Sequence, residues 1–174
     1  SWNKLSGYDF AIIRAGYGDE ISQKDRIFDS NMTGAISKNL KIGIYWFSYA
    51  DTILDAIAEA HTCLSIINTY KPHISLPVFF DYEGASLLYY QKIHGSKPSS
   101  TLINQMATAF MQTIMDAGYQ TGLYTNNDYR RNVFTYTTLH YGKLWLADYN
   151  KSSKVYPCDI QQTCSDGKLP GISS

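Results

Sequence analysis

The feature that most constrains the fold of this chain is its alternation of short apolar runs with longer segments of helical periodicity. The predicted strands are Phe10–Arg14, Lys41–Phe47, Leu76–Asp81, Thr121–Thr125, Lys143–Ala147 and Asp159–Thr163. Helical spacing covers residues 28–39 and 53–70, and a third helix is predicted from Ser99 or Ser100 to Ala117. The stretch before Ser99 is interpreted as a polar loop through Gly95, Lys97 and Pro98. Parallel neighbours need a crossover, so this order predicts one α/β domain over residues 1–174 with a mostly parallel sheet.

Two α/β architectures fit this order, a barrel and a doubly wound open sheet. The turn after the first strand, Ala15-Gly-Tyr-Gly18, is too short for the GxGxxG of a dinucleotide-binding sheet. Several strands also end in polar or aromatic residues, and a barrel assembles its chemistry at the C-terminal rim of its strands. We therefore predict a TIM-like (β/α) barrel.

The strongest candidate for a catalytic site is the pair of acids that closes the third apolar run, Leu76-Pro-Val-Phe-Phe-Asp81-Tyr-Glu83-Gly84. Side chains alternate along a strand, so Asp81 and Glu83 share one face, about 6–7 Å apart, and Tyr82 takes the other. At that separation an ionised carboxylate raises the pKa of its neighbour, which then serves as a general acid. A solvated turn with two ordinary surface acids fits the spacing equally well.

Composition argues against several other classes of function. The net charge is zero and Lys and Arg are scattered, so no nucleic-acid surface is predicted. No apolar stretch reaches the length of a membrane span, and no signal peptide is expected from the opening residues. The four histidines lack metal-ligand spacing, so neither a metal nor another cofactor is expected. Cys63, Cys158 and Cys164 are predicted to be buried thiols, with a Cys158–Cys164 bridge as the alternative.

Tyrosine is unusually abundant, at 15 of 174 residues. Aromatic rings stack on the apolar faces of sugars, and phenol hydroxyls bond to sugar hydroxyls. Most tyrosines in any domain are nevertheless packing residues with a solvated tip. The composition is therefore compatible with a carbohydrate groove without establishing one.

Five segments, in order along the chain, resemble glycoside hydrolase family 25, the lysozymes with an irregular α/β barrel. They are Asp9–Gly18, Gly43–Ala50, Leu76–Glu83, Gly118–Asn126 and Leu144–Tyr149. Each is weakly specific alone, but five in sequence with plausible spacing are a strong signal, and the resemblance covers nearly the whole chain. The resemblance implies a peptidoglycan-degrading muramidase that hydrolyses the β-1,4 bond between N-acetylmuramic acid and N-acetylglucosamine. It also implies a monomer that acts on peptidoglycan glycan strands as a secreted, wall-associated or phage-released protein.

The family's Asp-x-Glu motif falls on Asp81 and Glu83, so the resemblance implies that Glu83 is the catalytic acid. It further implies a retaining, substrate-assisted reaction in which the 2-acetamido group of the substrate attacks and Asp81 orients it. A direct nucleophilic role for Asp81 is less favoured, because acid and nucleophile normally flank the bond from different strands.

Polar and aromatic residues at the strand ends are the candidates for substrate binding. They are Arg14, Tyr45, Phe47, Tyr49, Tyr124, Asn126, Asp148, Tyr149 and Gln162. Tyr45 and Tyr49 are favoured over Phe47 for stacking, and Arg14 is expected to pair with a carboxylate at the rim. Trp145 is interpreted as barrel packing rather than as a stacking platform.

Two parts of the family pattern have no counterpart in the chain: a first strand before Trp2–Leu5 and a last strand after Gly171–Ser173. Each would supply an acid, so we expect a barrel open at one seam and weak activity from this span unless flanking segments are added. The alternative function is a catalytically impaired domain that binds wall glycan. A chitinase-like barrel is less favoured, because Val78–Phe80 replaces the acids of its longer motif.

Overall fold

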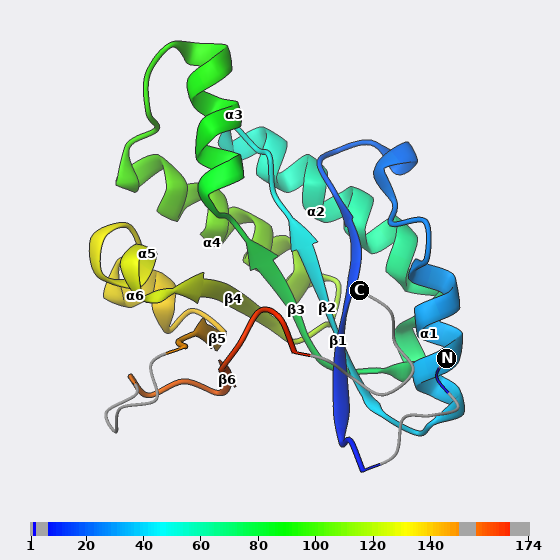
Figure 1. Ribbon diagram of the computed structural model, residues 1–174. Coiled ribbons are helices and arrows are strands. Elements are labelled where there is room, and N and C mark those ends of the chain that lie inside the picture. Colours follow the sequence, from blue (N-terminus) through cyan, green and yellow to red (C-terminus); the bar gives the residue numbers. More distant parts are fainter. Residues whose placement is uncertain (1, 3–6, 150–155, 168–174) are drawn as a thin grey trace.

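Six parallel strands, hydrogen-bonded in chain order, form one curled sheet in the computed structural model, which describes residues 2, 7–149 and 156–167 (Figure 1). The strands are β1 (Phe10–Tyr17), β2 (Lys41–Phe47), β3 (Ile74–Asp81), β4 (Thr121–Asn126), β5 (Lys143–Ala147) and β6 (Ile160–Gln162). The sheet is a half-barrel, which confirms the predicted α/β fold with an incomplete barrel. Within the described residues β1 and β6 are its two edges.

Helices follow most strands, as a parallel sheet requires. They are α1 (Phe28–Ser37), α2 (Ile53–Ile67), α3 (Gly84–His94), α4 (Ser100–Asp116), α5 (Asn127–Asn132) and α6 (Tyr136–Leu139), with 3-10 turns at Ile21–Gln23 and Asn68–His73. Helices α2 and α4 pack against each other and against the sheet. The Ser99 hydroxyl accepts a hydrogen bond from the Leu102 amide at 3.1 Å, so the predicted start of α4 is confirmed.

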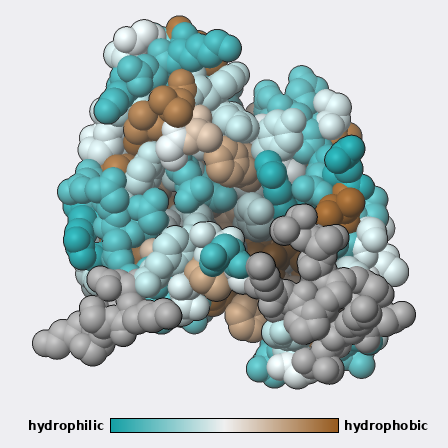
Figure 2. All heavy atoms as spheres, viewed as in Figure 1, coloured by the Kyte–Doolittle hydropathy of each residue, from teal (hydrophilic) through white to brown (hydrophobic). Residues whose placement is uncertain are grey.

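Helix α3 occupies a stretch that the sequence analysis assigned to a polar loop, and that prediction is wrong. Among its residues only Ser86 is buried, while Leu88 and Ile93 are 66% and 50% exposed. Apolar side chains accordingly gather at the surface over α3 (Figure 2). Because the helix buries no continuous apolar stripe, its sequence lacks the periodicity from which a helix is predicted.

The two faces of the sheet carry different clusters of side chains. The helix-covered face holds the main core, with Ile44, Trp46 and Phe80 all 0% exposed. The opposite, concave face holds a smaller cluster built on Phe79 and Tyr124. Alternation of side chains along each strand separates the two sets, so the concave face is free to form a site.

Some predictions concern residues outside the described part of the chain. The segments next to the expected first and last family strands include residues 3–6 and 171–173, of which nothing is described. Within the described residues, no helix is long and apolar enough to cross a membrane. All three cysteines are free, and only Cys63 is buried, so the prediction of buried thiols is wrong for exposed Cys164 and the alternative bridge is not formed.

Candidate active site

Asp81 and Glu83 lie where β3 ends and α3 begins, in the middle of the sheet. In the strand register Asp81 is opposite Phe47 on one side and Tyr124 on the other. Tyr82 points into the main core and is 1% exposed. The predicted separation of the two acids from Tyr82 by strand alternation is therefore confirmed.

Both acids line a cavity of about 340 Å³ on the concave face. The cavity is lined by Arg14, Tyr45, Phe47, Asp81, Glu83, Tyr124, Trp145 and Gln162. Every strand of the sheet contributes to this set, β6 through Gln162. Seven of the eight were proposed from the sequence, since only Trp145 was given a different role.

Asp81 is buried, with 5% of its surface exposed, and its Oδ1 atom has no hydrogen-bond partner within the described part of the chain. Burial raises its pKa well above the ordinary value, and the nearby Glu83 charge raises the pKa further. The Arg14 guanidinium partly offsets this rise. Oδ1 of Asp81 is thus a buried oxygen to which none of the described residues donates a hydrogen bond.

Glu83 is half-buried, and burial is also the main cause that raises its pKa. A hydrogen bond with the Tyr124 side chain lowers the pKa in part. Strand alternation predicts a raised pKa from the charge of Asp81; the direction agrees, but the leading cause is desolvation. Two desolvated carboxyls in one cavity retain protons to higher pH than isolated ones, as general acid catalysis requires.

The backbone around Glu83 fixes where its side chain emerges. Glu83 is the N-cap residue of α3, in extended conformation, and its amide donates to the Ser86 hydroxyl at 3.2 Å. The carbonyl oxygen of Asp81 accepts a hydrogen bond from the Ser48 amide at 2.8 Å. The two acids are therefore held by the sheet on one side and a helix start on the other.

Trp145 forms one wall of the cavity. Its ring packs edge-on against Tyr124 at 4.6 Å, Phe79 at 5.5 Å and Tyr45 at 6.0 Å between centroids. Trp145 therefore packs, as expected, and also presents a surface to the cavity. The strand register explains why Trp145 lines the cavity. Trp145 lies opposite Tyr124 on β4, and Tyr124 lies opposite Asp81 on β3.

Arg14 does not form the expected ion pair. The salt bridges among the described residues are Lys24–Asp29, His94–Asp51 and Lys143–Asp159, and Arg14 is in none of them. Its guanidinium lies 5.4 Å from the centre of the Tyr17 ring and 6.0 Å from that of Phe47, in cation–π geometry. From there it acts on Asp81 through its charge.

Four of the proposed binding residues lie outside this cavity. Asn126 caps α5, accepting from the Asp128 and Tyr129 amides at 3.0 Å each. Tyr149 is 49% exposed and its hydroxyl accepts from Gln162 at 3.1 Å, while the Asp148 amide donates to the Gln162 carbonyl at 3.0 Å. Tyr49 lines a neighbouring pocket. No cluster of His, Cys, Asp and Glu among the described residues is arranged to hold a metal ion.

Paired, desolvated carboxyls at the C-terminal end of a parallel strand, in a cavity walled by aromatic rings, are typical of glycosidases built on a barrel-type fold. The profile of the glycosyl hydrolases family 25 matches residues 1–172, and the chain belongs to this family. The family resemblance seen in the sequence is thereby confirmed. A comparison with curated protein sequences finds no significant match.

Solved structures share the fold at low sequence identity. The modular autolysin LytC from Streptococcus pneumoniae, in complex with a synthetic peptidoglycan ligand, superposes with a TM-score of 0.78 and 20% identity over 94% of this chain. The catalytic domain of endolysin ply40 from bacteriophage P40 of Listeria monocytogenes gives 0.70, with 20% identity, over 95% of this chain and 78% of that one. A family GH25 lysozyme from Aspergillus fumigatus gives 0.65, with 23% identity, over 88% and 73%. The chain spans 38% of the length of LytC.

Proposed function

We propose that this chain is a muramidase, which hydrolyses the β-1,4 bond between N-acetylmuramic acid and N-acetylglucosamine in peptidoglycan. The observation that carries the proposal is the pairing of Asp81 and Glu83 in one aromatic-walled cavity, where burial raises the pKa of both. Membership of glycosyl hydrolases family 25 supports it. The choice of substrate is supported by LytC, a protein of similar fold whose structure was solved in complex with a synthetic peptidoglycan ligand.

In the proposed reaction Glu83 is the general acid. A glycosidic oxygen leaves only when it is protonated, so Glu83 gives its proton to that oxygen as the bond to the anomeric carbon breaks. The acetamide oxygen of the substrate forms the new bond to the anomeric carbon. Water then attacks the same carbon while Glu83 takes a proton from the water. The bond from that carbon to the acetamide oxygen breaks, which restores the acetamide and retains the configuration.

Asp81 has a supporting role in this scheme. The attacking acetamide needs an acceptor for its N–H, and the carboxyl of Asp81 lines the cavity beside Glu83. In the proposed step Asp81 acts in its ionised form, which the positive charge that develops on the acetamide stabilises. The proposed task of Asp81 is therefore to orient and stabilise the acetamide.

The remaining cavity residues position the glycan. Trp145, Tyr45 and Tyr124 offer aromatic surface for sugar rings, and Gln162 and Arg14 offer donors to hydroxyl or carbonyl groups. We further propose that the protein acts as a monomer at the bacterial cell wall, as a secreted, wall-associated or phage-released enzyme. The second candidate, a wall-glycan-binding domain with impaired catalysis, is favoured by the unpaired β1 and β6 edges of the described half-barrel.

The test is to incubate the chain with purified cell walls and measure turbidity and new reducing ends. Borohydride reduction followed by acid hydrolysis identifies the sugar at each new end. Muramicitol is the expected product, whereas glucosaminitol would overturn the bond assignment. Walls that bind the chain but yield no new ends would favour the second candidate. Asp116→Asn is a matched control, because this exposed carboxylate at the end of α4 lies outside both pockets.

A further inference from the structure

Arg14 connects the catalytic cavity with a second pocket. It lines the cavity together with Asp81 and Glu83, and it also lines a neighbouring pocket of about 450 Å³. The end of β1 and residues 22–27 form the described lining of that pocket. Among the described residues, Arg14 is the one that the two linings share. A substrate in the cavity can therefore extend past Arg14 into the pocket.

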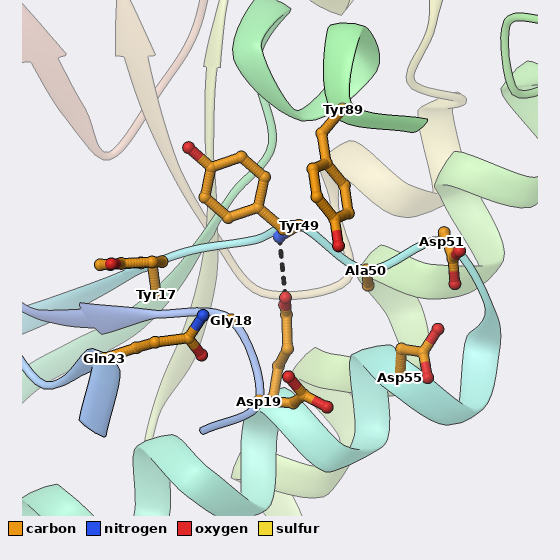
Figure 3. A pocket seen from close by; sticks show the side chains of 10 residues that line it. Tyr17, Gly18, Asp19, Gln23, Tyr49, Ala50, Asp51, Asp55 and Tyr89 are labelled. Atoms are coloured by element: carbon orange, nitrogen blue, oxygen red, sulfur yellow. Dashed lines mark hydrogen bonds between the residues drawn. The ribbon is translucent and has the colours of Figure 1, made fainter. Parts of the chain in front are cut away.

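Aromatic rings hold the guanidinium of Arg14 in place. It lies 5.4 Å from the centre of the Tyr17 ring and 6.0 Å from that of Phe47. The Tyr49 ring packs against both, at 5.8 Å from Tyr17 and 5.1 Å from Phe47, and Figure 3 shows Tyr17 and Tyr49 next to each other. Tyr49 is fixed in turn from α2, because its amide donates a hydrogen bond to Glu59 Oε1 at 2.7 Å, the dashed line in Figure 3. The guanidinium is therefore positioned before a ligand arrives.

The charge of Arg14 is not matched by a partner in the described part of the chain. Arg14 is half-buried, and it forms neither a salt bridge nor a hydrogen bond with a described residue. Its Nε atom is buried, so the two Nη groups are the donors that a ligand can reach. Burial raises the pKa of Asp81, which makes this neighbouring carboxyl a weak counter-charge in the free protein. A desolvated guanidinium stays ionised and is costly unless an anion comes to it.

The second pocket carries an excess of positive charge. Its described lining holds three cations and one acid, namely Arg14, Lys24, Arg26 and Asp25. Lys24 is paired with Asp29 at 2.6 Å, whereas exposed Arg26 is in none of the salt bridges among the described residues. The catalytic cavity, in contrast, places two carboxyls beside Arg14. This distribution of charge orients a substrate with its anionic end at Arg14 and its sugar ring at the acids.

Muramic acid differs from N-acetylglucosamine by one group, and that group suits such a site. A lactyl ether replaces the hydroxyl on C3 and ends in a carboxyl carbon, from which the stem peptide of peptidoglycan continues. A carboxylate on this arm accepts two parallel hydrogen bonds from a guanidinium, because the two groups are planar and match in spacing. N-acetylglucosamine offers neither the charge nor the planar acceptor at that position.

We propose that Arg14, through its two Nη groups, binds a carboxylate on the acidic arm of muramic acid. Arg14 thereby selects muramic acid over N-acetylglucosamine for the sugar position beside Glu83. The inference rests on the proposed function, since it concerns the same substrate in the same cavity. Two parts of the arm can supply the carboxylate: the lactyl group itself where the peptide has been removed, and the glutamate of an attached stem peptide, which would lie in the second pocket.

Binding measurements on probes without a glycosidic bond between sugars test this without requiring hydrolysis. Isothermal titration compares N-acetylmuramic acid with its methyl ester, and N-acetylmuramoyl-L-Ala-D-Glu with its diamide. We expect the carboxylate probe of at least one pair to bind about tenfold more tightly than its uncharged counterpart, which is the lower end of what a hydrogen bond to a charged group contributes. The pair that responds identifies the source of the carboxylate. Equal affinities within both pairs would overturn the proposal.

Arg14→Gln supplies the protein side of the test. Glutamine keeps a hydrogen-bond donor but loses the charge, so the two probes of the responding pair should bind equally. Arg131→Gln removes the same charge from an exposed position on α5, outside the cavity and the second pocket, and should keep the parental difference. A difference that survives Arg14→Gln would overturn the assignment of Arg14.

Arg14→Lys takes the place of Arg14→Gln if the glutamine variant does not fold. Lysine keeps the charge but lacks the planar pair of donors, so the difference between the paired probes should shrink. An undiminished difference in Arg14→Lys would overturn binding through two Nη groups.

The wall assay tests the proposed function separately. A chain that releases muramic acid ends but binds the paired probes equally would refute the role of Arg14 and leave the proposed function intact. A chain that releases no such ends would refute the proposed function itself.

Discussion

Replacing Glu83 with glutamine is the most direct test of the proposed chemistry. Glutamine keeps the size of the side chain and an oxygen that accepts from Tyr124, but it has no proton to give. A positioned general acid contributes about 10²–10⁴ in rate. At about 1.4 kcal/mol per tenfold, that corresponds to a loss of about 3–5 kcal/mol in transition-state stabilisation. We expect a loss of at least a hundredfold, because Glu83 is the less buried acid and remains accessible to a glycosidic oxygen.

Two measurements on Glu83→Gln distinguish a loss of catalysis from a loss of folded protein: the unfolding free energy and the pKa of Asp81. Glutamine keeps the backbone hydrogen bond to Ser86 and an oxygen that can cap α3, and burial disfavours the charged form of Glu83, so the unfolding free energy of Glu83→Gln should not fall. The Glu83 charge is one cause of the raised pKa of Asp81. In Glu83→Gln the pKa of Asp81 should therefore fall, as observed by carboxyl-carbon NMR.

The assay is the release of reducing ends from purified walls at equal concentrations of folded protein, with Asp81→Asn as comparator. Asp81→Asn should also be damaging but leave more residual activity, because Asp81 only orients the acetamide. If Glu83→Gln released muramic acid ends at nearly the parental rate, the catalytic acid would be another group and the reasoning would be refuted.

Three further predictions concern other parts of the molecule. Folding raises the pKa of Glu59 from 4.5 to about 8, so the folded state holds the extra proton in that window and stability should fall as pH rises through it. Urea unfolding measures the unfolding free energy at each pH, and its slope against pH should be shallower in Glu59→Gln by up to about 1.4 kcal/mol per pH unit. Identical slopes in the two proteins would contradict the raised pKa of Glu59. Exposed Cys164 should react with a thiol reagent in the native state, whereas Cys63, whose pKa burial raises, should react only after unfolding. Mass spectrometry of labelled peptides shows which of the two cysteines is modified before unfolding. Gly122→Ala should lower the unfolding free energy by about 1–3 kcal/mol, because a Cβ there would lie 2.5 Å from both the Phe79 ring and the Lys143 carbonyl oxygen. An unchanged melting curve would contradict this steric argument.

The local parts of the fold could be predicted from the sequence. The bounds of β2 and β5 agree with the predicted ones, because strand alternation depends only on adjacent residues. The same alternation placed Asp81 and Glu83 together and Tyr82 apart. Helix α3 could not be found in this way, since it has no apolar stripe to reveal it.

The parts of the site that escaped prediction depend on contacts between distant segments. Trp145 faces the cavity because of the register between β4 and β5, which no local pattern specifies. The supporting role of Glu59 beside Tyr49 was also not predicted, although its position held a signal. It stands between Ala56 and Cys63 on the buried side of α2, where a charged residue needs a reason. Its bond to the Tyr49 amide appears only when the helix folds back over the end of β2.

The order of the strands in the sheet has a consequence for synthesis on the ribosome. Each strand pairs with the one made immediately before it, so the sheet can grow by addition as the chain emerges. The cavity, however, draws on all six strands, and Gln162 is its last contributor among the residues that the structure describes. A nascent chain would thus acquire most of its core well before it acquires a complete site. For the proposed enzyme, catalytic competence would therefore be the last of these properties to appear.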